Sequence, residues 1–475
     1  MFKKILVALG MSVLLLTACS QTADGGNSAD LLGPSSDSDT TRDIDIYEAE
    51  LAFNYSLLDF YYAYGHARNE LADNYKAYLN MGTSDVNSVK GGCSPEFYDV
   101  CYMFNQMRDP FTQYFDYVDA QRVYNRIFSS RTVLGSGVEV EEFSGENGEG
   151  LRVTDVCRKS PGNLAGLKAG DEIYSVNDQH VVTQSDFNNL CSGNKGDVVN
   201  MVVVRGEDTL AFEVEINEYY AASVKSYYVD SIPVIQINQF VATSVSDSGS
   251  YGEFIDALKK TNGAKSTIID LRGNPGGDTD QCDAISAAML SKGDTIIIDV
   301  ETMVDSVMEE KGWRYFQAFD TIVYRAEVDG LGKDRYYVFL ADSSSASCSE
   351  VVLSAIAVNK ESPIVGQLTY GKGIGQFVFI SSIGKGISLI TAMQGMDKNG
   401  NSYHDKGILP DFALDNPDEQ MANAVALAKE MSAVRTAGYG TTSTGHFSKK
   451  SLASEARTFS NNLDDMKMRF RVFSN

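Results

Sequence analysis

The chain has 475 residues, of which 43% are hydrophobic and 22% are charged, and its formal net charge is −24. A surplus of carboxylates repels phosphates, so this composition argues against nucleic acids and anionic lipid surfaces as partners. The length exceeds what a single hydrophobic core organises, and it predicts two or three domains.

The N-terminus has the pattern of an export signal. Lys3 and Lys4 precede an apolar segment at 5–17, and these 13 residues fall short of the span needed to cross a membrane. The segment leads into "LTAC", which resembles the lipobox of bacterial lipoproteins and ends at Cys19. This resemblance implies a signal peptide over 1–19, a lipid anchor on Cys19, and a location in the cell envelope on the periplasmic or outer-membrane face. An ordinary signal peptide with a chance cysteine is the alternative.

The next two segments differ sharply in composition. Residues 20–44 are rich in Ser, Asp and Gly and predict a flexible linker, because they cannot bury enough apolar surface to fold. Residues 45–130 form a predicted N-terminal helical region, in which Tyr, Phe and Leu recur at helical spacing over 49–79. This aromatic stripe favours packing in a core or between domains over a ligand site.

Residues 131–218 predict a compact β-rich domain. Short alternating strands lie between Gly, Asn and Asp turns, and helices are predicted at 160–167 and 183–191.

Residues 219–430 alternate between apolar strands and helices. We predict strands at 232–240, 266–273, 295–300, 335–342 and 363–367, and helices at 248–260, 280–291 and 349–360. This order predicts an α/β core with a largely parallel sheet buried on both faces. Sites in such sheets form beyond the carboxyl ends of strands, where "DLRGNPGGD" at 270–278 and "ADSSSASCSE" at 341–350 lie. The tail, 431–475, has no assignment.

Six cysteines remain once Cys19 is assigned to lipid: Cys93, Cys101, Cys157, Cys191, Cys282 and Cys348. Export places them where disulfides are permitted. Cys93 with Cys101 and Cys157 with Cys191 are candidate pairs, although spacing establishes neither. The sequence has no C-x-x-C zinc pattern, and we predict no metal site.

The serine-rich stretch at 342–350 is either a polar loop or a nucleophile on a strand-to-helix turn. Ser347 and Glu350 form a capping box ahead of an apolar helix, and we interpret Glu350 as a cap rather than a catalytic acid. The two interpretations are compatible, because N–H groups at a helix start can stabilise an oxyanion. The other serines, Ser344, Ser345 and Ser349, fit loop polarity and local backbone hydrogen bonding, and Cys348 is disfavoured as a nucleophile.

A serine nucleophile needs a base. Of four histidines only His404 lies in the α/β region, in a turn where a solvated surface residue is expected. Lys372 lies between two glycines after a buried strand, and burial lowers a lysine pKa so that the neutral amine can take a serine proton. We therefore expect activity to rise with pH. Gln376, four residues on, could orient the amine. A solvated turn lysine is the alternative.

"SASCSE" together with "YGKGIGQ" resembles the carboxyl-terminal processing peptidases, also called tail-specific proteases. Their pattern is S-A-S-A-S-E, followed by G-K-G-x-x-Q about 25 residues on. The resemblance implies a serine-lysine dyad with Ser347 as nucleophile, Lys372 as general base and Gln376 as its orienting residue. It also implies a ClpP/crotonase-like protease core without metal or cofactor.

The same resemblance covers the predicted oxyanion site. "DLRGNPGG" matches a strand-loop signature of the family, which implies that the Gly276 amide is one donor, with Gly277 as the competing assignment. The Cys348 amide is the implied second donor. Cys348 replaces the alanine of the family pattern, a modest change in size at a position whose role belongs to the backbone.

Two segments resemble PDZ domains. "VLGSGVEV" at 133–140 is similar to their carboxylate-binding loop, and 160–178 to their S-P-A-x-x-A-G-L signature. The resemblance implies that a substrate's terminal carboxylate binds the loop formed by Leu134, Gly135, Ser136, Gly137 and Val138. The substrate end then adds as a strand, and Leu134 with Val138 would favour an apolar last side chain.

Two functions follow. The first is a lipid-anchored serine endopeptidase that recognises the C-terminal region of exported proteins. The alternative is a catalytically inactive PDZ-containing scaffold or peptide-binding lipoprotein. The retained serine, lysine and glutamine favour the enzyme, since a scaffold needs none of them. The oligomeric state and the physiological substrates are not predicted.

Overall fold

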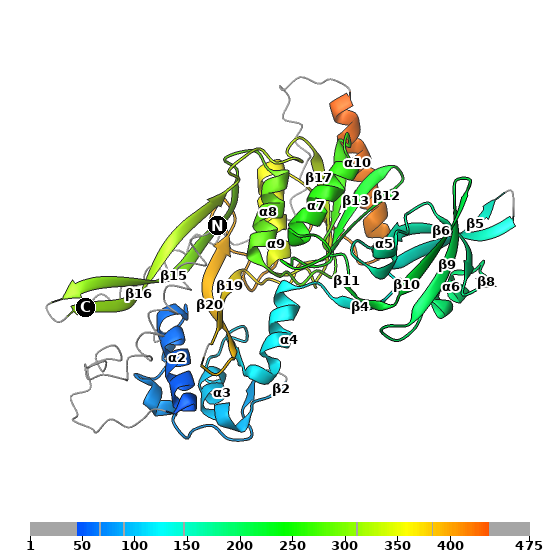
Figure 1. Ribbon diagram of the computed structural model, residues 1–475. Coiled ribbons are helices and arrows are strands. Elements are labelled where there is room, and N and C mark those ends of the chain that lie inside the picture. Colours follow the sequence, from blue (N-terminus) through cyan, green and yellow to red (C-terminus); the bar gives the residue numbers. More distant parts are fainter. Residues whose placement is uncertain are drawn as a thin grey trace. The chain divides into compact units, whose positions relative to one another are not determined.

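The structure is a computed structural model that describes residues 45–436 apart from 66–67, 89–90, 146–147, 310–311 and 382. The predicted signal peptide, Cys19, the linker and the tail beyond Thr436 lie outside the described residues. Two compact units are present (Figure 1). The first comprises the described residues up to Ala120 with Gln376–Thr391, and the second comprises Gln121–Gly375 with the described residues from Ala392 onward.

The first unit is helical and rich in aromatic side chains. Its elements are α2 (Ile46–Tyr61), η3 (Tyr75–Tyr78), β1 (Asn87–Ser88), β2 (Gly91–Gly92), η4 (Pro95–Phe97), α3 (Tyr98–Asn105) and β3 (Gln113–Phe115). The prediction of one long helical stretch over 49–79 was wrong, because α2 ends at Tyr61. The following segment contains Gly65 and Asn69, and Asn69 adopts a left-handed φ of 54° that an α-helix cannot include. The aromatic stripe packs in the core, where Tyr61 contacts the rings of Phe377 and Phe379.

The second unit begins within α4 (Tyr117–Phe128) and continues into the predicted β-rich domain. The strands of that domain are β4 (Thr132–Gly135), β5 (Val138–Gly145), β6 (Gly148–Val156), β7 (Glu172–Val176), β8 (Gln179–His180), β9 (Val198–Arg205), β10 (Asp208–Glu215) and β11 (Asn217–Tyr220). They form a sheet in the order β10-β9-β7-β6-β5, with β8 on β7, and β4 pairs separately with β11. The two predicted helices are confirmed as α5 (Pro161–Ala165) and α6 (Gln184–Leu190).

A six-stranded sheet forms the centre of the second unit. Its order is β12 (Val224–Val229), β13 (Ile232–Ile237), β14 (Ser266–Asp270), β17 (Tyr336–Ala341), β18 (Ile364–Gly366) and β21 (Phe412–Ala413). Four neighbouring pairs are parallel, and β12 is antiparallel to β13. The parallel arrangement brings the loops after β14 and β17 to the same edge of the sheet.

Helices cover both faces of this sheet. One face packs against α7 (Gly249–Lys260), α8 (Thr279–Met289) and α9 (Cys348–Lys360) in a single apolar cluster (Figure 1). The other face packs against α10 (Pro417–Thr436), through Val234, Ile268 and Val338 among others. Side chains alternate between the two clusters along each strand, which accounts for the continuous apolar runs in the sequence. Helix α10 continues past residue 430, where we placed the end of the core.

A second sheet has the order β16-β15-β20-β19, with β3 on β20. It contains β15 (Thr295–Glu309), β16 (Gly312–Arg325), β19 (Ile374–Ile380) and β20 (Ile387–Met396). Strands β15 and β16 form a long two-stranded ribbon, of which the sequence predicted only the first six residues (Figure 1). Among the described residues, no helix is both long enough and apolar enough to span a membrane.

Candidate active site

Ser347 lies at the junction between a buried strand and a buried helix. Strand β17 ends at Ala341, and Ser347 is the N-cap of the 13-residue helix α9. Its φ of 55° is unusual for a residue with a side chain, and such a torsion costs about 1–3 kcal/mol. Ala346 and Cys348 on either side are buried, whereas Ser347 stays partly exposed. The turn therefore presents one hydroxyl at the positive end of a helix.

The neighbouring serines fasten this turn to the loop after β14. Ser345 and Ser349 are fully buried, and their hydroxyls donate to the carbonyl oxygens of Leu271 and Asn274 at 2.8 and 2.9 Å. The Ala346 N–H donates to the same Asn274 oxygen at 3.0 Å. We predicted only local backbone bonding for these serines, but the bonds bridge two loops about 75 residues apart in sequence.

Gly276 lies directly against residues 346–348, which carry the predicted nucleophile Ser347 and are called the nucleophile turn below. A Cβ on Gly276 would stand 2.8 Å from Ser347 Cβ and 3.1 Å from the Cys348 nitrogen, and its φ is 101°. Only glycine therefore fits at this position. The Gly276 N–H donates to Asn274 Oδ1 at 2.9 Å, so this bond must be exchanged before the amide can bind an oxyanion. The assignment of Gly276 and Cys348 as donors stays a prediction.

Glu350 connects the nucleophile turn to the loop at 369–372, which carries Lys372 and is called the lysine loop below. Its buried carboxylate accepts the Ser347 N–H at 2.9 Å, as expected of a capping box. The same oxygen, Oε2, accepts the Lys372 N–H at 2.8 Å. Oε1 accepts the Gly371 N–H at 2.7 Å and the Thr369 hydroxyl at 2.6 Å. The cap interpretation is confirmed but incomplete, because the side chain also holds the loop that carries the predicted base.

The glycines beside Lys372 permit a close approach of the turn at 403–407. A Cβ on Gly371 would lie 2.8 Å from the Gly407 nitrogen, and one on Gly373 would lie 2.8 Å from the His404 nitrogen. The prediction that His404 is solvated was wrong, since its side chain is only 18% exposed. Within the described part of the chain, its Nδ1 is buried without a hydrogen-bond partner. Packing against the lysine loop explains this burial.

Gln376 lies in β19 and belongs to the first unit. Its amide donates to Thr391 Oγ1 at 3.3 Å, and the Thr391 hydroxyl in turn donates to Asp109. The role of Gln376 in orienting Lys372 stays a prediction.

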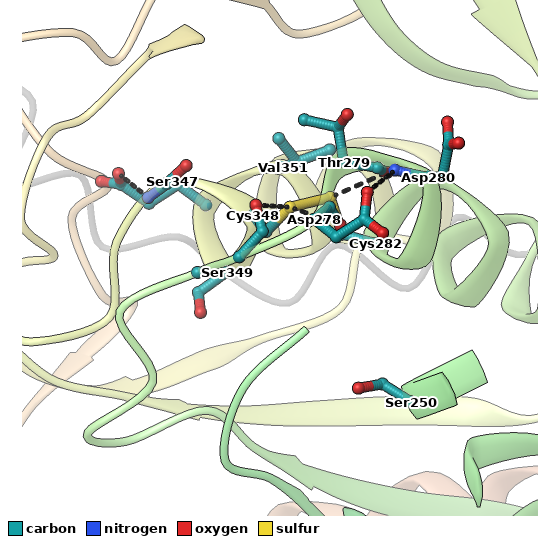
Figure 2. Close-up of a disulfide and its surroundings, with 12 residues drawn as sticks. Ser250, Asp278, Thr279, Asp280, Cys282, Ser347, Cys348, Ser349 and Val351 are labelled. Atoms are coloured by element: carbon teal, nitrogen blue, oxygen red, sulfur yellow. Dashed lines mark hydrogen bonds between the residues drawn. A yellow bond between two sulfur atoms is a disulfide. The ribbon is translucent and has the colours of Figure 1, made fainter. Parts of the chain in front are cut away.

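Disulfides join Cys93 to Cys101 and Cys282 to Cys348. The candidate pair Cys157 with Cys191 was wrong, because both residues are free thiols. Figure 2 shows the Cys282–Cys348 bond beside Ser347, between the first turn of α8 and the first residue of α9. No spacing rule indicated this pair, whose members lie 66 residues apart.

Asp278 caps helix α8 next to this disulfide. Its carboxylate accepts the Asp280 N–H at 3.1 Å. Burial raises the pKa of Asp278 to about 6, which outweighs the lowering effect of that hydrogen bond.

The predicted carboxylate-binding loop at 134–138 comprises the end of β4, Ser136, Gly137 and the first residue of β5. Gly137 has a φ of 72°, and a Cβ there would lie 2.2 Å from Ser160 Cβ, so the "SPGNLAG" turn packs directly on the loop. Strand β5 is at the end of its sheet and pairs only with β6 among the described strands. Leu134 is 48% exposed, while Val138 packs on the domain core. The exposed edge of β5 is suited to addition of a peptide strand.

Comparison with known proteins adds two family matches and several relatives. Residues 231–414 match peptidase family S41, and residues 133–216 match the PDZ domain. The "Probable CtpA-like serine protease" of Staphylococcus epidermidis is 26% identical over 327 residues, covering 68% of this chain and 61% of that protein. The protein of the same name from Staphylococcus aureus strain COL is 27% identical over 333 residues, with coverages of 69% and 61%.

The chain thus spans about three fifths of the length of the curated relatives that it matches. Among solved structures, the photosystem II D1 C-terminal processing protease aligns with a TM-score of 0.43 at 19% identity, covering 77% of this chain and 92% of that one. Both family matches fall on the segments that carry the motifs described above. Over residues 231–414 this chain is thus similar to peptidase family S41, and over residues 133–216 it is similar to the PDZ domain.

Proposed function

We propose that this protein is a serine endopeptidase with a Ser347–Lys372 dyad. The observation that carries the proposal is the shared acceptor: the backbone N–H groups of Ser347 and Lys372 both donate to Glu350 Oε2. The turn that carries Ser347 and the loop that carries Lys372 are thereby held at one oxygen atom, although Lys372 follows Glu350 by 22 residues. Ser347 itself has a strained backbone torsion at the start of a helix. A peptide-binding scaffold has no need of this arrangement.

The proposed reaction follows from these groups. The neutral Lys372 amine removes the Ser347 proton as the hydroxyl oxygen attacks the scissile carbonyl carbon. Backbone N–H groups of Cys348 and Gly276 stabilise the resulting oxyanion. The tetrahedral intermediate expels the amine product, which takes the proton from the Lys372 ammonium. Water then hydrolyses the acyl-enzyme by the same route and frees Ser347. Gln376 orients the amine in this proposal.

The PDZ domain supplies substrate choice. We propose that a terminal carboxylate binds the loop at 134–138 and that the substrate end pairs with the free edge of β5. Apolar C-termini are the preferred class, because Leu134 offers exposed apolar surface near the loop. The substrates are exported proteins, and the enzyme is held in the cell envelope by lipid on Cys19. The protease core belongs to the ClpP/crotonase-like folds, a proposal supported by its sheet order.

Cleavage of an unfolded protein tests the proposal. The full chain, purified in detergent, is incubated with β-casein alongside Ser347→Ala and Lys372→Ala. We expect cleavage by the natural chain alone, and EDTA should leave the rate unchanged. If all three proteins give the same result in the casein assay, the enzyme proposal fails, and the role of a scaffold or peptide-binding lipoprotein remains.

A further inference from the structure

The Cys282–Cys348 disulfide joins the two segments that carry the predicted oxyanion donors. Cys282 lies in the first turn of α8, just after the loop with Gly276 and Gly277, and Cys348 directly follows Ser347 (Figure 2). Both cysteines are buried, with 0% and 1% of their surface exposed. The bond therefore adds a covalent link between two segments that hydrogen bonds from Ser345, Ala346 and Ser349 already join.

The residues around the bond are closely packed. A Cβ on Gly276 would already stand 2.8 Å from Ser347 Cβ, and Cys348 Sγ lies 3.3 Å from the Asp278 carbonyl oxygen. Interiors packed this closely transmit a local displacement to their neighbours. A change at the sulfur atoms is therefore expected to reach Gly276 and Ser347.

Two thiols need more space than one disulfide. Bonded sulfur atoms stand about 2 Å apart, whereas non-bonded heavy atoms pack at about 3.5–4 Å. Reduction must therefore be accommodated by a change of side-chain torsion at Cys282 or Cys348, or by a shift of the first turns of α8 and α9. A misplacement of about 1 Å can cost about 100-fold in rate when groups must align in a transition state.

We propose that closure of the Cys282–Cys348 disulfide activates this enzyme and that the reduced chain is a poor peptidase. The inference rests on the proposed function. Closure is a thiol–disulfide exchange in which one cysteine thiolate attacks an oxidant of the disulfide class and releases one thiol, and the second attacks the resulting mixed disulfide and releases the other thiol. The two cysteines lose two electrons and two protons, and the oxidant is released as two thiols. The chain would stay inactive in the reducing cytosol and become active after export.

The remaining cysteines allow a clean test. Cys157 and Cys191 are free thiols, and burial raises the pKa of Cys157 to about 11 and that of Cys191 to about 12. The Cys93–Cys101 bond lies in the first unit, outside the peptidase segment, and provides a matched disulfide.

The experiment compares reduced and oxidised full-length protein. The chain is prepared in dithiothreitol, transferred to oxidised glutathione, and assayed on labelled casein while free thiols are mapped by alkylation and mass spectrometry. Cys93→Ala/Cys101→Ala keeps only the proposed switch, and Cys282→Ala/Cys348→Ala keeps only the matched disulfide. We expect oxidation to raise kcat at least about tenfold in the natural chain and in the first variant, with KM unchanged. The second variant should show no response.

A purely stabilising disulfide predicts a different result, in which activity follows the folded fraction measured by circular dichroism at the assay temperature. Equal kcat before and after mapped closure of Cys282–Cys348 would overturn the inference, as would a response of Cys282→Ala/Cys348→Ala. If a variant does not fold, thiol mapping of the natural chain during oxidation shows which of its two disulfides closes as kcat rises. If the natural chain cleaves casein in neither redox state, and is thus no more active than Ser347→Ala, the proposed function is refuted instead.

Discussion

Ser347 and Lys372 donate their backbone N–H groups to the same carboxylate oxygen, Oε2 of Glu350, at 2.9 and 2.8 Å. A buried carboxylate that accepts four hydrogen bonds from two segments is costly to disturb, because each released donor would be left unpaired in the interior. The backbones of the proposed nucleophile and base are thus held close together by one side chain.

Glu350→Gln should lower kcat by about 100-fold, since one carboxylate oxygen becomes an amide NH2 group that faces N–H donors, and the two segments shift apart. Stability should fall by about 1–3 kcal/mol, the usual cost of buried polar groups left unpaired. Casein cleavage and urea unfolding measure the two effects. Glu361→Gln, at the exposed C-terminal end of the same helix, is the matched control and should change neither. Full activity in Glu350→Gln would show that the carboxylate is only a helix cap.

Gly371→Ala should reduce both melting temperature and activity. The new methyl group would lie 2.8 Å from the Gly407 nitrogen, and the residue would keep a φ of 90°. Gly263→Ala separates these two effects, because Gly263 has a φ of 85° but open space around its Cβ position. Gly263→Ala should therefore cost only about 1 kcal/mol, from the backbone alone, and leave kcat unchanged. Equal losses in the two variants, measured by thermal unfolding and casein cleavage, would mean that close packing of the lysine loop is unimportant.

Asp278 should make stability fall as the pH rises through about 6. Burial raises its folded-state pKa to about 6 from an ordinary value of 3.8, so between these pH values the folded chain holds a proton that the unfolded chain has lost. Stability then decreases with increasing pH across this window and is level above it. Asp278→Asn should flatten the slope between pH 4 and 6 in urea unfolding followed by fluorescence. Asp280→Asn, which changes the exposed neighbour on the same turn, is the control. An unchanged slope in Asp278→Asn would assign the pH dependence to other groups.

The sequence predicted the central sheet and its helices closely, because buried elements leave a clear pattern. Strand β14 and helix α9 were predicted within three residues of their observed ends. The ribbon of β15 and β16 was missed beyond Val300, since its outer residues are largely exposed and no buried face marks them as a strand. The helix predicted over 49–79 ends early, because the local spacing of apolar residues does not show where the chain leaves the helix and turns back on its own unit.

The site was predictable where chemistry depends on short motifs and unpredictable where it depends on contacts. Ser347 and Lys372 stand in recognisable patterns of hydroxyl, glycine and lysine. The bond from Lys372 to Glu350 spans 22 residues, and the disulfide from Cys282 to Cys348 spans 66, so neither leaves a local trace. Long-range contacts of this kind are set by the parallel order of β14, β17 and β18, which places their following loops at one edge.

Gly137→Ala should abolish recognition of C-terminal peptides while it leaves the peptidase segment folded. A Cβ at this position would overlap Ser160 Cβ at 2.2 Å and displace the loop that we expect to bind a carboxylate. Titration calorimetry with a peptide that ends in an apolar residue should give binding to the natural chain and at least a tenfold weaker affinity for the variant. The same peptide with an amidated C-terminus is the ligand control and should bind the natural chain no better than the variant binds the free acid. Gly170→Ala, with a φ of 92° and open space nearby, controls for backbone strain in the same domain. Tight binding of the amidated peptide would show that this domain holds internal segments of its substrates rather than their ends.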